Sequence, residues 1–186
     1  MLLIRSLLIT AITFSVLGCA LRPTTDADHV PWYATPPVGS YVELGQELTA
    51  SRGKRIYVQD GQARSRREII EWQPYCQFYV ERRGAEMREP LVIAPDRFVI
   101  NKVYRRKDFY TAIAGTQYAF VIGGLFNDNG SSQRTMSTHM EIFSSQQPKV
   151  TRLICSRWAD PYHYNHVRVH EIQASLGSIA KLVPAS

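Results

Sequence analysis

Short runs rich in Val, Ile, Tyr and Phe recur along the chain after Gly39, and Gly, Pro and polar clusters separate them. Within several runs the apolar residues fall at every second position, as do Ile56 and Val58, or Phe78 and Val80. A period of two places such residues on one face of a β-strand. The pattern predicts strands over residues 41–48, 54–59, 75–82, 97–104, 117–122, 135–143 and 150–157, with a short final strand over 178–183.

One segment near the C-terminus has the spacing of a helix instead. Val169, Ile172 and Leu176 fall three and four residues apart, which brings them to one helical face. Asn165 is the candidate N-cap and Gly177 the candidate stop. The sequence therefore predicts a mainly β fold. We expect a single antiparallel domain, sandwich-like or a partly closed barrel, with about seven strands and one short C-terminal helix.

The first eighteen residues differ from the rest of the chain. A single cation, Arg5, precedes twelve uncharged residues, 7–18, and these are the proportions of a secretory signal. The run is too short to span a bilayer core, which needs about twenty residues. It ends in Val16-Leu17-Gly18-Cys19, after which the sequence becomes polar. The alternative is an uncleaved N-terminal anchor in which the cysteine has no special role.

This ending resembles the lipobox of bacterial lipoprotein precursors. The resemblance covers only the leader. It implies that a lipid is added to the thiol of Cys19, that residues 1–18 are removed, and that the new N-terminus is acylated. Ala20 rather than Asp follows the cysteine, which in Gram-negative sorting favours the outer membrane. Several acyl chains would anchor the protein stably, because two suffice. We expect an outer-membrane lipoprotein whose body faces the periplasm.

The remainder divides into a tether and a body. Residues 19–39 contain four prolines and no apolar periodicity, which is typical of a linker. Residues 40–186 form the predicted β-rich domain. Removing residues 1–18 from the 186 leaves 168, which is enough for one domain with a hydrophobic core.

Three cysteines occur, and lipidation of Cys19 would leave Cys76 and Cys155. An exported protein with two remaining cysteines most simply pairs them, because the periplasm is oxidising. Both fall on the apolar faces of predicted strands, so the bond would join two strands. The loop between them is long, and the chain-entropy model gives about 4.5 kcal/mol of stabilisation. Two buried free thiols are the alternative.

A local excess of positive charge is the strongest sign of a binding surface. Between Arg52 and Lys107 the sequence has fourteen Lys and Arg against seven Asp and Glu. Lipid headgroups, lipopolysaccharide phosphates, acidic polysaccharides and acidic protein surfaces are the anionic partners that an envelope offers. Nucleic acid is not expected. The alternative is scattered arginines that solvate the sheet and protect its edges. The candidate partner-binding residues are Arg64, Arg66, Arg67, Arg105 and Arg106.

A second candidate site is the run His163, His166 and His170, whose last two members would lie one helical turn apart and could share a metal. Three exposed or capping histidines are the alternative.

No Gly-x-Ser-x-Gly motif and no cofactor motif is present. We therefore expect a non-catalytic, lipid-anchored envelope protein that binds an anionic partner or supports an envelope assembly and needs no cofactor. A metal-binding envelope protein and a small envelope hydrolase are the alternatives.

Overall fold

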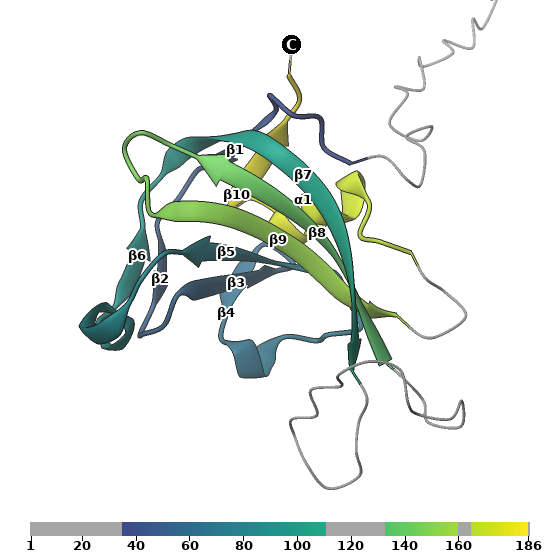
Figure 1. The fold of residues 1–186 in the computed structure, drawn as a ribbon, viewed down its shortest axis with the longest axis horizontal. Helices are drawn as coiled ribbons and strands as arrows, with labels where there is room; N and C mark the ends of the chain where they lie inside the picture. The colour runs from purple at the N-terminus through teal and green to yellow at the C-terminus, as the bar shows by residue number, and fades with distance from the viewer. Residues whose placement is uncertain (1–34, 111–132, 160–164, 186) are drawn as a thin grey trace, which may run out of the picture. The chain divides into compact units, whose positions relative to one another are not determined.

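A computed structural model describes residues 35–110, 133–159 and 165–185. They form a mainly β fold with one α-helix, and the main element is a curled antiparallel sheet of eight strands, an open half-barrel (Figure 1). Its strand order is β10-β1-β7-β8-β9-β5-β3-β4, and β2 and β6 form a separate pair. The strands are β1 (Tyr41–Leu44), β2 (Leu48–Ala50), β3 (Arg55–Gln59), β4 (Gln62–Arg64), β5 (Tyr75–Val80), β6 (Leu91–Ile93), β7 (Asp96–Tyr110), β8 (Gln133–Phe143), β9 (Val150–Ala159) and β10 (Ala180–Val183); the helix is α1 (Val169–Leu176). The expected mainly β fold with a C-terminal helix is confirmed.

The inner face of the curled sheet carries the hydrophobic core. Alternate residues of neighbouring strands meet there, among them Phe78, Phe98 and Leu153, none of which is exposed. The strand pair β2–β6 adds Leu48 and Ile93 to the same core. Figure 1 shows that β7, β8 and β9 are the longest strands and curve most strongly. Because the apolar core lies on the inner face, the outer face of the curved sheet can carry polar side chains.

Helix α1 packs against β3, β5 and β10. Its Ile172 and Leu176 are fully buried, as the helical spacing predicted. Gly177 ends the helix with φ 56°. A Cβ atom there would lie 2.5 Å from the Cα of Gly61, in the tight turn between β3 and β4. Position 177 therefore needs glycine for two reasons: its φ is positive, and the turn at Gly61 leaves no room for a Cβ atom.

The predicted start of the helix is wrong. Asn165 is not the N-cap: α1 begins at Val169, and the residue before it, Arg168, is extended. The carbonyl of Asn165 instead accepts hydrogen bonds from Arg157 on β9, at 3.2 Å from Nε and 3.1 Å from Nη2. Because this contact holds Asn165 against the sheet, the chain turns into the helix one turn later than the sequence predicted.

The predicted strands agree with the observed ones except at their ends and in two short pieces. The first predicted strand breaks at Gly45 into β1 and β2, while β7 extends well beyond 104. The three-residue strands β4 and β6 were not predicted. The predicted strand over 117–122 lies outside the described residues. Asp60 and Gly61 end β3 as expected, with φ 53° and 69°, because both positions of this tight turn need positive φ.

Cys76 and Cys155 are directly opposite each other on β5 and β9. Their sulfur atoms lie 2.09 Å apart, at the distance of a disulfide, and neither residue is exposed. The predicted pairing of two strands through these cysteines therefore agrees with the geometry. In the part of the chain that the structure describes, no helix has the length and apolarity needed to cross a membrane.

Candidate anion-binding site

The outer face of the sheet is hollowed by a groove of about 590 Å³ that crosses β3, β5, β9, β8 and β7; we call it the sheet groove. Cross-strand pairing explains the hollow. Ser156 on β9 and Ser137 on β8 are direct neighbours, and the larger Tyr75 and Arg106 flank them on either side. Small side chains in the middle of a row and long ones at its ends leave a depression with a polar floor.

A loop after β4 forms one rim of the sheet groove. The side chain of Gln59, fully buried at the end of β3, accepts a hydrogen bond from Ile70 N (3.0 Å) and donates one to Ile70 O (2.9 Å). Glu71 in the same loop forms an ion pair with Arg66. Arg66 also lies over the ring of Tyr57, 5.8 Å from its centroid. These contacts fix the position of Arg66 at the rim.

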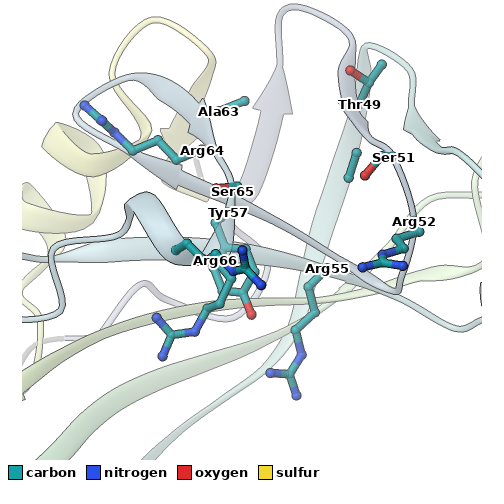
Figure 2. A pocket seen from close by; sticks show the side chains of 11 residues that line it. Thr49, Ser51, Arg52, Arg55, Tyr57, Ala63, Arg64, Ser65 and Arg66 are labelled. Carbon is teal, nitrogen blue, oxygen red and sulfur yellow. The ribbon is translucent and has the colours of Figure 1, made fainter.

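A second hollow of about 570 Å³, the edge pocket, lies on the other side of β3. It shares Arg55, Tyr57 and Arg66 with the sheet groove. Figure 2 shows Arg55 and Arg66 pointing to the same side as the Tyr57 ring, whereas Arg64 points away from them. Five arginines and no acidic residue line this pocket: Arg52, Arg55, Arg64, Arg66 and Arg67. The two hollows therefore form one continuous basic surface around β3.

The structure brings together four of the five arginines predicted to bind a partner. Arg64, Arg66 and Arg67 line the edge pocket, and Arg66 and Arg106 line the sheet groove. Arg105 lies elsewhere. It pairs across the strands with the buried Thr138, itself opposite Cys155, so it belongs to the inner face. Consecutive residues of a strand point to opposite faces, which separates Arg105 from Arg106.

Charge in the sheet groove is strongly positive. Five cations on the outer face line it, against one carboxylate, that of Asp108. Asp108 is already paired with Arg106, with 2.7 Å between Oδ1 and Nε. The other cations are Lys54, Arg55, Arg66 and Arg152. Lys107 borders the groove, but its cross-strand partner Met136 places its side chain on the inner face. A concave surface with such an excess of Arg and Lys attracts anions, and arginine in particular suits phosphate and carboxylate groups.

The floor of the groove also contains polar groups that sequence reasoning missed. His139 is 8% exposed and stacks on Tyr104 with 4.9 Å between ring centroids. Burial, reinforced by the charges of Arg106 and Arg152, lowers the pKa of His139 to about 4, so the ring is neutral at pH 7. Among the described residues, three buried floor atoms have no hydrogen-bond partner: Gln77 Oε1, Thr135 Oγ1 and His139 Nδ1.

Ser137 and His139 are hydrogen-bonded, with 3.0 Å between Oγ and Nε2. A serine beside a histidine is one element of a hydrolytic site. Three features make this pair a poor nucleophile and base. Ser137 is only 2% exposed, its hydroxyl also lies 3.3 Å from the carbonyl of Arg106, and a histidine with a pKa near 4 is a weak base at pH 7.

Two of the three histidines predicted to bind a metal are described, and His163 is not. His166 lies before α1, with a pKa lowered by burial and by Arg105. His170 is in the first turn of α1 and is exposed. Because the helix begins only at Val169, the two do not stand one helical turn apart, as the sequence predicted. Within the described ranges, no three His, Cys, Asp or Glu residues are grouped as metal ligands.

Comparison of the chain with models of protein families, with curated proteins and with solved structures finds no match. The leader and the outer face of the sheet are therefore the features of this chain that bear on its function.

Proposed function

We propose that this chain is an outer-membrane lipoprotein that binds an anionic component of the cell envelope and does not catalyse a reaction. The lipid on Cys19 would hold the body in the periplasm, close to the membrane. The sheet groove and the edge pocket would contact the partner. The observation that carries the proposal is the sheet groove itself, a polar hollow with five cations on its face and one already paired carboxylate.

The other features are consistent with this proposal. A disulfide between buried cysteines suits an oxidising compartment such as the periplasm. The cations come from several strands and from the loop after β4, so the fold presents them together. Arg66, one of the predicted residues, stands where the two hollows join.

A co-purification experiment tests the proposal. The acylated protein is captured from detergent-solubilised envelopes at low and at high salt, and the bound protein or glycolipid is identified by mass spectrometry. We expect a specific partner at low salt that is lost at high salt, since screening weakens surface electrostatics. The triple variant Arg66→Gln/Arg67→Gln/Arg106→Gln should lose the partner as well.

A matched control removes three cations that line neither hollow: Arg97→Gln/Lys149→Gln/Arg168→Gln. Each set contains two exposed ion-paired cations, with Glu71 and Asp108 as partners in the first and Glu43 and Glu86 in the second. The control should retain the partner. Equal loss in both variants, or a partner that is insensitive to salt, would contradict the proposal.

A further inference from the structure

Three cations surround the ring of Tyr79 on the outer face of the sheet. Tyr79 on β5 is the direct cross-strand neighbour of Arg55 on β3 and of Arg152 on β9. From the ring centroid, Arg152 Cζ lies at 4.2 Å, Lys54 Nζ at 5.1 Å and Arg55 Cζ at 5.9 Å. All four residues line the sheet groove. We call Lys54, Arg55, Tyr79 and Arg152 the Tyr79 cluster.

The cations of the Tyr79 cluster have no carboxylate partner among the described residues. The nearest acidic neighbour in the register is Glu141, opposite Arg152 on β8, and it pairs instead with Lys102, with 3.5 Å between Oε1 and Nζ. Three positive charges around one ring repel each other, and the π-face of one tyrosine is a weak compensation. An anion that binds all three would remove this repulsion.

The arrangement favours a phosphate over a carboxylate. The cations come from β9, from β3 and from the residue just before β3, so they surround one point from different directions. A carboxylate offers two coplanar oxygens and one charge, whereas a phosphomonoester offers three oxygens and nearly two charges.

We infer that the Tyr79 cluster binds a phosphate group of the dianionic kind, such as a phosphomonoester or a diphosphate. The inference rests on the proposed function and names the chemistry of its anion. The phosphate can belong to a lipid headgroup that faces the protein or to a soluble phosphorylated molecule. Both present the same group to Lys54, Arg55 and Arg152.

Titration calorimetry of the full chain with inorganic pyrophosphate tests the inference. We expect binding, and we expect succinate, a carboxylate dianion, to bind at least ten-fold more weakly. Arg152→Gln should lower the affinity for pyrophosphate about ten-fold or more, the usual effect of removing one charge-assisted contact. Arg97→Gln is the matched control, because Arg97 also lies 4.2 Å from a tyrosine centroid, that of Tyr41, but does not line the groove.

A second variant should change the affinity in the opposite direction. Glu141→Gln removes the negative charge beside Arg152, so pyrophosphate should bind about two-fold more tightly or better. A gain of affinity cannot arise from a partly unfolded protein. Together, a loss in Arg152→Gln, a gain in Glu141→Gln and no change in Arg97→Gln would assign the phosphate to the Tyr79 cluster.

Two further arms distinguish the source of the phosphate. Sedimentation with phosphatidylcholine vesicles that contain phosphatidic acid, compared with vesicles that contain phosphatidylglycerol, detects a monoester headgroup. Competition by glucose 1-phosphate at comparable concentration detects a soluble ligand. Pyrophosphate that does not bind, that binds no better than succinate, or that is affected equally by Arg97→Gln would overturn the inference. The proposed function would survive that result if the salt-sensitive partner were still captured, and it fails separately if no partner is found.

Discussion

His139 is a titratable residue held neutral on the floor of a cationic groove. Its burial and its neighbours Arg106 and Arg152 lower its pKa from 6.5 to about 4. Between these two values the unfolded chain binds a proton that the folded protein does not, so the free energy of unfolding must fall as the pH decreases. The loss begins near pH 6.5 and is complete below pH 4.

We expect a loss of about 2 kcal/mol in the free energy of unfolding between pH 7 and pH 5 from this residue alone. Urea unfolding at both pH values measures it. In His139→Gln the corresponding loss should be smaller by that amount, because glutamine does not titrate and can still bond to Ser137. An unchanged pH dependence in the variant would show that the pKa of His139 is the same in the folded protein as in the unfolded chain.

The orientation of Ser137 and His139 could be predicted from the sequence, but their burial could not. The period-two pattern that places Met136, Met140 and Ile142 on the inner face also places Ser137 and His139 on the outer one, so their common face could be predicted. The same alternation separates Arg105 from Arg106. Their depth could not be predicted, because the rim that covers them comes from other strands and from the loop after β4. The position of a residue along its own strand does not show how large the side chains on the neighbouring strands are, and these determine how deeply it is buried.

One partly buried contact fixes helix α1 against the sheet. Arg157 on β9 donates from Nη1 to Oε1 of Glu171 at 2.8 Å, while Glu171 Oε2 accepts from the backbone N–H of Arg168 at 2.7 Å. Both charged side chains are about one-fifth exposed. A carboxylate in the first turn also interacts favourably with the helix dipole. Glu171 therefore caps the helix and joins it to β9 at the same time.

Replacing Glu171 by Gln should lower the free energy of unfolding by about 1–2 kcal/mol. The amide keeps the cap but loses the charge that Arg157 needs in a half-buried position. Denaturant unfolding measures the change. Glu43→Gln is the control, because its ion pair with Arg97 is exposed and longer, at 3.8 Å, and should contribute less than about 0.5 kcal/mol. Equal effects of the two substitutions would contradict the role given to Glu171.

Element types were predicted better than element ends, for an identifiable reason. Long strands with a buried face have a strong alternating pattern, and β5, β8 and β9 were recognised by it. The strands β4 and β6 are three residues long, too short for a pattern to show. The start of α1 depends on Arg157, a residue of another strand, so neither Asn165 nor its neighbours reveal it.

For the whole molecule, the order of strands in the sheet is the property least visible in the sequence. The sheet places β5 beside β9 although 69 residues, 81–149, separate them, and β1 between β7 and β10. The cysteines are an exception. The expected bond between Cys76 and Cys155 already implied that these two strands approach each other. The same pairing, continued along the strands on the outer face, brings Tyr79 beside Arg152. The predicted disulfide therefore identified β5 and β9 as neighbouring strands, and the sheet groove depends on that pairing.

The disulfide should contribute a large part of the stability of the domain. It closes a loop between residues 79 positions apart, so its removal should lower the free energy of unfolding by up to about 4.5 kcal/mol. The double variant Cys76→Ala/Cys155→Ala, unfolded in urea beside the oxidised parent, measures the change. Both sulfurs are buried, so thiol labelling of the native parent should detect neither, before or after mild reductant.

The control for this experiment is the binding of pyrophosphate in the sheet groove. Cys76 and Cys155 point to the inner face, whereas Tyr79 and Arg152 lie on the outer one, held by the hydrogen bonds between β5 and β9 rather than by the sulfur bridge. At a temperature where the double variant is folded, its affinity for pyrophosphate should equal that of the parent. A parent and a double variant with the same urea midpoint would mean that the cysteines contribute little to stability. A variant that is folded but has lost affinity would mean that the bridge sets the geometry of the outer face, which the register of the strands alone should maintain.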